Sequence, residues 1–241
     1  MKEETKMKTK NKALLLSLCA VLLVAVSVLG TLAYLTSKDS VVNTFSVGSV
    51  QLNLDEAKVN GNGDPIDKSG NKVTKLDEAE RVDNNTYKLI PGHSYTKDPT
   101  VTLLKGSEKS YIKMTVTVSY ANELDKIFAD NKITDLTNVI TGYDSTKWTY
   151  GGNTKDATAN TRTYTFYYHE TVSALDEAKT LEALFTGIKV PGSVTKEQLA
   201  TLYKSETDRL TITAKAYAIQ ADGFDNKEAA WTAFDGQVKT N

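Results

Sequence analysis

Cysteine and histidine are scarce in this chain, which contains one cysteine, Cys19, and two histidines, His93 and His169. Cys19 lies inside an apolar run near the N-terminus, so the residues after that run form no disulfide bond with one another. A thiolate nucleophile is excluded there as well. A catalytic zinc ion usually has three protein ligands, so the two histidines would have to meet a carboxylate in space.

The short motifs that signal catalysis are also missing. Ser173 stands where a His-Glu-x-x-His motif would place its second histidine after His169 and Glu170. There is no Gly-x-Ser-x-Gly sequence and no glycine-rich phosphate loop after a strand. Adjacent carboxylates such as Asp55 and Glu56 are typical of solvated charges. The sequence therefore predicts no catalytic residues, no metal ion and no cofactor, and a protein that is not an enzyme.

Neither sign of charge dominates the chain. The 29 lysines and arginines nearly balance the 30 aspartates and glutamates, which gives a net charge of −1 at pH 7. The two signs are interleaved along the sequence, so no basic stripe forms. A nucleic-acid-binding protein needs such a stripe to neutralise phosphates. We therefore expect no nucleic-acid partner.

Long apolar runs are limited to Ala13–Leu29, which follows five lysines within residues 1–12. Small side chains at Thr31 and Ala33 fit the subsites that a signal peptidase reads before its cleavage point. Together these features predict a secretory signal peptide over residues 1–33, with Tyr34 as the first mature residue and cleavage anywhere within 33–35 left open. The alternative is a retained membrane anchor, for which 17 residues is the short limit.

This prediction places the protein outside the cytoplasm, in the extracellular matrix or on the cell surface. Contact with the membrane is then expected only through the signal peptide, before it is cleaved.

Alternation of apolar and polar residues predicts several half-buried strands. The clearest spans Tyr111–Tyr120, and its apolar face consists of Ile112, Met114, Val116, Val118 and Tyr120. Similar alternation occurs in Arg162–Tyr168, in Leu210–Ala218 and around Val101. Strands with one polar face favour antiparallel pairing.

Helical spacing of apolar residues occurs in four segments between these strands. The segments are Asn122–Asn131, Leu175–Phe185, Thr195–Tyr203 and Asn226–Phe234. Thr195 suits the N-cap position of its helix. The predicted fold is therefore mainly β: an antiparallel β-sandwich over residues 49–241 with short helical insertions, preceded by the N-terminal signal helix.

Residues 55–85 contain turn-forming sequences, as in Asn60–Pro65, and little apolar material. They are predicted to form a long surface loop of the sandwich. Asp64, Asp67 and Asn71 offer oxygen ligands there, so calcium binding is an alternative. The 12-residue spacing of a calcium loop is absent, which favours a plain solvated loop.

Two strand-like pieces of opposite parity follow the predicted signal peptide. The apolar residues occupy odd positions in the first piece and even positions in the second: Val41, Phe45 and Val47, then Val50, Leu52 and Leu54. A slip of one residue turns every side chain to the other face of a sheet, and Gly48 tolerates the bend that this requires. Residues 41–47 and 49–55 are therefore predicted to belong to different sheets or to different molecules.

This region resembles the start of the TasA/camelysin family, exported proteins of Gram-positive bacteria whose signal peptides are cut by the SipW type of signal peptidase. The family pattern has a Gly-Thr-x-Ala cleavage region, an aromatic or apolar mature start, and an Asn-Thr-Phe-x-x-Gly segment about ten residues later. The matching residues here are Gly30, Thr31, Ala33, Tyr34, Asn43, Thr44, Phe45 and Gly48. The resemblance covers residues 30–54; the rest is similar only in its β-rich order.

The resemblance implies a jelly-roll-like β-sandwich that assembles into fibres of the extracellular, biofilm matrix. In such a fibre the N-terminal segment of one subunit, here residues 34–48, adds as a strand to the next subunit. Val41, Phe45 and Val47 would fill the groove, and head-to-tail addition would produce a filament. The implied partners are further copies of the chain and the SipW-type peptidase. The alternative is that residues 41–47 form an edge strand of their own domain.

Two other functions stay open at this point. A monomeric surface adhesin or carbohydrate-binding module would need an aromatic platform, for which Trp148, Tyr150, Tyr164 and Tyr167 are available. Tyr167 has the parity opposite to that of Tyr164, so it is expected to face away from the core. The family resemblance also carries a metallopeptidase label, which no constellation of residues in this chain supports.

Overall fold

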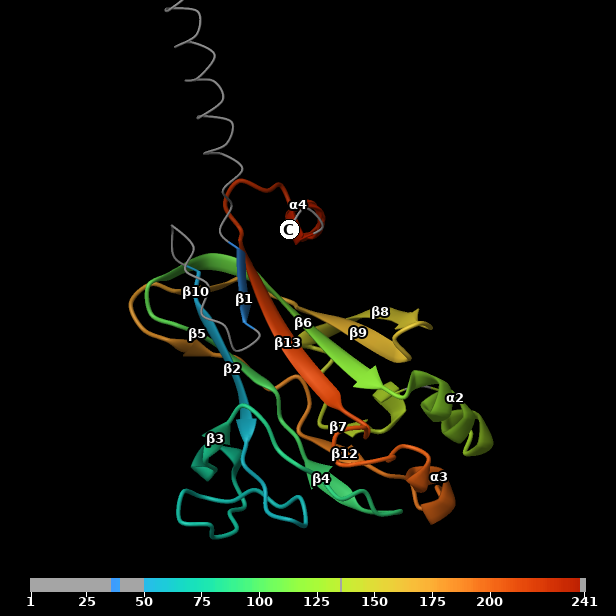
Figure 1. The fold of residues 1–241 in the computed structure, drawn as a ribbon. Helices are drawn as coiled ribbons and strands as arrows, with labels where there is room; N and C mark the ends of the chain where they lie inside the picture. Colours follow the sequence, from blue (N-terminus) through green and yellow to red (C-terminus); the bar gives the residue numbers. More distant parts are fainter. Residues whose placement is uncertain (1–35, 40–49, 135, 239–241) are drawn as a thin grey trace, which may run out of the picture. The chain divides into compact units, whose positions relative to one another are not determined.

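The computed structural model of the chain describes residues 36–39, 50–134 and 136–238. The predicted signal peptide and the rest of the predicted assembly segment, beyond Thr36–Asp39, lie outside these ranges. The described part is mainly antiparallel β-structure in three sheets (Figure 1). This confirms the prediction of an antiparallel β-sandwich with short helical insertions.

The largest sheet has the strand order β1-β13-β6-β9-β8, and β10 pairs with the beginning of β6. Its strands are β1 (Thr36–Asp39), β6 (Ser107–Ser119), β8 (Trp148–Asp156), β9 (Thr161–Tyr168), β10 (Val172–Ala174) and β13 (Ile212–Gln220). The long central strand β6 buries Ile112, Met114, Val116 and Val118, as its alternation predicted.

Two smaller sheets complete the β-structure of the described residues. One has the order β11-β5-β2-β3 and the other β4-β12-β7. Their strands are β2 (Leu52–Ala57), β3 (Arg81–Val82), β4 (Ser94–Thr96), β5 (Thr100–Leu103), β7 (Ile140–Thr141), β11 (Lys179–Thr180) and β12 (Gly187–Lys189). The main core lies between the first two sheets, where Leu52 and Leu103 of one join Trp148 and Phe166 of the other in a single buried cluster.

Three of the four predicted helices are present. They are α2 (Ala121–Asp130), α3 (Lys196–Ala200) and α4 (Lys227–Val238), and there are short 3₁₀ turns at η1 (Leu76–Glu78) and η2 (Leu136–Asn138). Thr195 caps α3 as predicted: its hydroxyl accepts a hydrogen bond from the Gln198 amide, and the Gln198 side chain accepts one from the Thr195 amide.

The helix predicted over Leu175–Phe185 is wrong. Instead, β11 pairs with β5, and the chain continues beside β5 with the Leu181 amide donating to the Val101 carbonyl at 2.9 Å. Leu181, Leu184 and Phe185 are buried in the core. An irregular segment beside a sheet can bury residues at this spacing as well as a helix can, so the spacing alone does not distinguish the two.

The loop predicted over residues 55–85 differs from the structure at both ends. Residues 55–57 continue β2, and Arg81–Val82 form β3 against it. Between these strands the chain folds into tight turns, closed by the bridges Val59–Pro65 and Ile66–Lys72. The extension of β2 places Glu56 and Ala57 in the interior, where both are buried.

Candidate functional site

β13 is paired along its whole length on only one side. β6 pairs with every residue from Ile212 to Gln220. On the other side β1 pairs with Ala216–Ile219, and no strand of the described ranges pairs with residues 211–215. The backbone of residues 211–215 is thus a free sheet edge, to which a further strand could bind.

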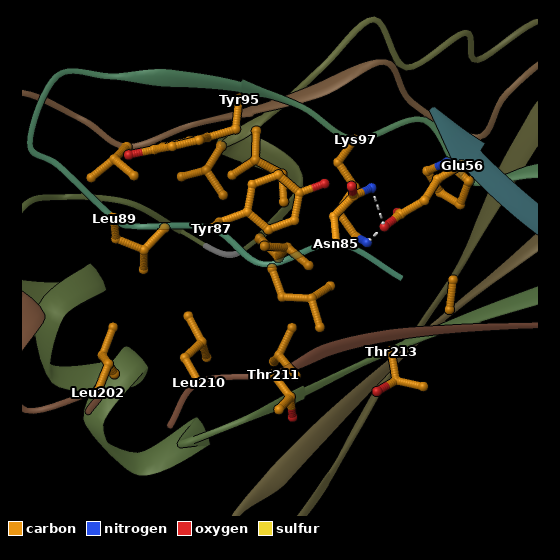
Figure 2. A pocket seen from close by; sticks show the side chains of 18 of the residues that line it. Glu56, Asn85, Tyr87, Leu89, Tyr95, Lys97, Leu202, Leu210, Thr211 and Thr213 are labelled. Carbon is orange, nitrogen blue, oxygen red and sulfur yellow. Dashed lines mark hydrogen bonds and ion pairs between the residues drawn. The ribbon is translucent and has the colours of Figure 1, made fainter. Parts of the chain in front are cut away.

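A cavity of about 730 Å³ borders this free edge. Every residue from Leu210 to Lys215 lines it. Successive side chains of a strand point to opposite faces, so a run of consecutive lining residues means that the edge of β13 itself faces the cavity. Figure 2 shows Leu210, Thr211 and Thr213 on one side of the cavity and Tyr87 with Leu89 across from them.

One end of the cavity is apolar because two short helices close it. Ile127 and Phe128 of α2 lie in the same hydrophobic cluster as Leu199 of α3 and Leu202. Leu89, Leu202 and Leu210 stand together at this end in Figure 2. A large apolar side chain entering the cavity here would be removed from water on all sides.

The opposite end of the cavity is polar and holds a buried ion pair. The Nζ of Lys97 lies 2.5 Å from an oxygen of Glu56, and the Asn85 amide donates to the other oxygen at 2.9 Å. The two charged side chains are only 9% and 7% exposed. Burial, together with the carboxylates of Glu56 and Asp98, raises the pKa of Tyr87, which therefore stays neutral at pH 7. The polar end thus presents the paired charges of Lys97 and Glu56 and the neutral hydroxyl of Tyr87.

A second ionic network fixes the wall behind this end. Arg81 donates to Asp55 at 2.8 Å and to Asp98 at 2.6 Å, and Asp98 also accepts from the Ala57 amide at 2.6 Å. Burial raises the pKa of Asp98, although the hydrogen bonds from Ala57 and Arg81 oppose the rise. Lys97 and Arg81 thus pair with the carboxylates of Asp55, Glu56 and Asp98. Among the described residues no group of three or more His, Cys, Asp or Glu side chains could hold a metal ion.

The sequence-predicted functional residues themselves lie outside the described ranges. They are the cleavage residues Thr31, Ala33 and Tyr34 and the assembly residues Val41, Asn43, Thr44, Phe45, Val47 and Gly48. One part of the assembly segment is described: Thr36–Asp39 forms β1 and pairs with β13 immediately next to the free edge.

The other sequence candidates are dispersed. His169 is exposed and His93 is partly buried. His93 contacts the Asn62 carbonyl at 2.7 Å in its turn. In the candidate calcium loop, Asp64 pairs with Lys72 at 2.7 Å, and Asp67 accepts hydrogen bonds from the amides of residues 69 and 71. These carboxylates therefore stabilise the turns of the loop.

The four aromatic residues considered for a sugar platform do not share one surface. Trp148 and Tyr164 are buried in the core, 0% and 2% exposed. Tyr167 lies on the opposite face of the sheet, as its parity predicted, and its ring packs 6.1 Å from that of Trp231 in α4. The proposed platform is thus divided between the core and the helix contact.

The sequence did not predict the residues that form the polar end of the cavity. The sequence predicts a solvated carboxylate at Glu56, yet this residue is only 5% exposed. A signal was present, because Glu56 continues the even-numbered inner positions of Leu52 and Leu54. Lys97 and Asn85 carried no such signal, since only the fold brings residues 41 and 29 positions away to the same carboxylate.

Comparison of the chain with protein-family models, with curated proteins and with solved structures gives no match. In the described part of the chain, none of the helices combines the length and apolarity needed to cross a membrane. The cavity and the free edge of β13 are therefore the features of the described residues that point to a function.

Proposed function

We propose that this protein is a secreted structural protein that assembles head to tail into extracellular matrix fibres. Each copy would insert its N-terminal segment into the groove beside β13 of the next copy. The register of β1 against β13 carries this proposal, because it predicts where each residue of the segment would lie.

In this register Thr36 is opposite Ile219 and Asp39 is opposite Ala216. Its continuation along the free edge would place Val41 opposite Ala214 and Thr44 opposite Thr211. Phe45 would follow at the apolar end, where the Leu210 amide donates to the Leu202 carbonyl at 2.7 Å. Directly opposite residues of an antiparallel pair share one face of the sheet. Ala216 and Ala218 are completely buried, so the even positions of β13 face the core.

The odd positions of the inserted segment would therefore face the cavity. These are the positions at which the sequence has Val41, Phe45 and Val47. Phe45 would enter the apolar end, beside Leu202 and Leu210. Burying a valine or phenylalanine side chain contributes about 1.5–3 kcal/mol each, in addition to backbone hydrogen bonds with Ile212 and Ala214.

Chain length favours insertion into a second copy over insertion into the same copy. The Gln51 amide donates to Ser107 at 3.0 Å, and β6 begins at Ser107, three residues before Ser110, which is opposite Gln220 at the end of β13. Thr211 is nine positions from Gln220, roughly 30 Å along an extended strand. A segment that followed the edge as far as Thr44 would have six steps left to reach Val50, about 20 Å at most.

The segment before Val50 is thus too short to pair with the whole free edge of its own copy and still return to the start of β2. The segment of a neighbouring copy has no such constraint and could follow the edge from Ile219 to Thr211, beyond which the Leu210 amide donates to the Leu202 carbonyl. Because donor and acceptor surfaces differ, this contact does not close on itself and produces a filament.

Deletion of residues 34–47 from the mature protein tests the proposal directly. The truncated protein is expected to stay monomeric in sedimentation and to form no fibres in electron micrographs. Polymerisation equal to that of residues 34–241 would overturn strand donation.

Disulfide trapping tests the direction of insertion. Removal of the signal peptide removes Cys19, so introduced cysteines are the only thiols. One variant carries Val42→Cys and a second variant carries Thr213→Cys. When the two variants are mixed and mildly oxidised, we expect a covalent dimer. Thr154→Cys, at an exposed threonine of β8, replaces Thr213→Cys in the control and should give none. A cross-link that forms only when both cysteines share a chain would contradict insertion between copies.

A further inference from the structure

The outer face of the six-stranded sheet carries a regular array of hydroxyl side chains, here called the hydroxyl face. Strand register aligns Thr213, Thr117, Thr163 and Thr154 in one row across β13, β6, β9 and β8. The rows on either side of it add Thr115 and Thr165, and Thr211, Ser119 and Thr161.

These side chains point away from the core, since the alternate residues of the central strands β6 and β9 are the buried ones, as at Val116, Val118 and Tyr164. Each is partly or fully exposed. The hydroxyls of Thr117 and Thr163 lie 2.9 Å apart, so neighbouring strands are already connected across the face. The only charged residues in these three rows are Lys215 of β13 and Asp156 of β8, which lie on the two outermost strands of the face. The face is therefore poor in charge compared with the whole chain, in which 24% of the residues are charged.

The helix α4 limits the face on one side. Tyr167 and Lys113 occupy the next row and pack beneath α4, where the Lys113 Nζ lies 4.6 Å from the ring of Trp231. The rows beyond α4 have no such cover from the described residues. They present no aromatic ring, which a surface for stacking sugars would need.

We propose that the hydroxyl face is a lateral contact with a second copy of this chain, and that it joins neighbouring filaments side by side. A hydroxyl group both donates and accepts hydrogen bonds, so the face is complementary to itself. Removal of the signal peptide removes five lysines and two glutamates, which leaves copies with negative net charge. Two copies therefore carry net charge of the same sign, and this face, which is poor in charged side chains, adds little to their repulsion.

The size of the face determines when this contact is stable. The face spans three spacings between strands, roughly 14 Å, and three rows that are two residues apart along each strand, again roughly 14 Å. Its area is therefore on the order of 200 Å². A stable dimer buries about 800 Å² per partner, so two isolated copies would associate only weakly. A filament presents the face once per subunit, and these contacts add along its length. In this form the inference rests on the proposed strand donation.

The test introduces like charge at the centre of the face. The double variant Thr117→Lys/Thr163→Lys is expected to form single filaments that pellet only at high speed, with loss of the bundles that pellet at low speed. The matched control is Thr102→Lys/Thr180→Lys, a cross-strand pair of hydroxyls 3.0 Å apart in the other sheet. The proposal would be overturned if the hydroxyl-face variant formed bundles as well as the unmodified protein does. It would also be overturned if the control variant lost its bundles to the same extent.

A second measurement separates this inference from strand donation if no filaments form at all. Mature protein with a nitroxide at Thr154→Cys is mixed at high concentration with isotope-labelled, unmodified protein. Broadening of the Thr117 and Thr163 methyl signals, with the Thr102 signal unchanged, would support the contact even though the proposed function had failed. Equal broadening or none at these three positions would reject it.

Discussion

The Nζ of Lys97 lies 2.5 Å from a carboxylate oxygen of Glu56, and both side chains are buried at the polar end of the cavity. Removing one partner would leave a buried charge without its counter-ion. We expect Lys97→Met to lower the free energy of unfolding by about 3–5 kcal/mol, measured by urea denaturation.

The control replaces both partners. Lys97→Met combined with Glu56→Leu removes both charges, and stability should return most of the way because a buried pair contributes little more than an apolar pair of similar volume. If the single Lys97 variant is as stable as the unmodified protein, Glu56 is not held by Lys97 in solution.

The predicted anchor of the donated strand is Phe45. Phe45→Ala removes the ring from the apolar end of the neighbour's groove, a loss of about 3–5 kcal/mol for a fully buried phenylalanine. The critical concentration for fibre formation should rise by about two orders of magnitude or more. Val42→Ala, at an outward position of the same segment, should leave it nearly unchanged. Equal effects of the two variants in pelleting assays would contradict the register extended from β1.

Tyr120 predicts a specific loss of stability at alkaline pH. Its hydroxyl donates to the Asp208 carboxylate, and this hydrogen bond raises the pKa of Tyr120 to about 12. An unfolded tyrosine loses its proton near pH 10. Between these values the folded state holds one more proton than the unfolded state, so the stabilisation is complete below pH 10 and lost as the pH rises towards 12.

Comparison with Tyr120→Phe isolates this effect, since the other tyrosines titrate in both proteins. The stability difference between the two proteins, from urea denaturation at pH 8 to 12, should shrink above pH 10. A difference that stays constant over this range would show that Asp208 does not hold the proton on Tyr120.

The attachment of α4 depends on aromatic packing more than on its ion pair. The Lys113 Nζ lies 4.6 Å from the rings of Trp231 and Phe234 and 2.9 Å from a carboxylate oxygen of Asp235. Trp231 is buried, whereas the side chain of Asp235 is 58% exposed. We expect Trp231→Ala to reduce stability by about 3–5 kcal/mol and Asp235→Asn by about 1 kcal/mol or less. The reverse order in thermal unfolding would disprove this account.

Sequence patterns predicted the strands and most of the helices because these depend on local spacing. Ile112 to Val118 alternate between the faces of β6 whatever that strand pairs with, and Thr195 caps α3 through a residue three positions away. The same reasoning failed at Leu175–Phe185, where a neighbouring strand and not the spacing decided the conformation. It also failed at Glu56, whose burial depends on Lys97.

The contact proposed between copies could be predicted from the sequence only on its donor side. The odd parity of Val41, Phe45 and Val47 is a property of consecutive residues, so the sequence by itself determined which side chains a donated strand would present. The acceptor edge could not be predicted from the sequence in this way. An edge is free only if no strand pairs with it, and this depends on how all the strands are arranged. Only the tertiary structure decided that β6 covers all of β13 while β1 covers less than half of it, since these pairings join residues that lie far apart along the chain.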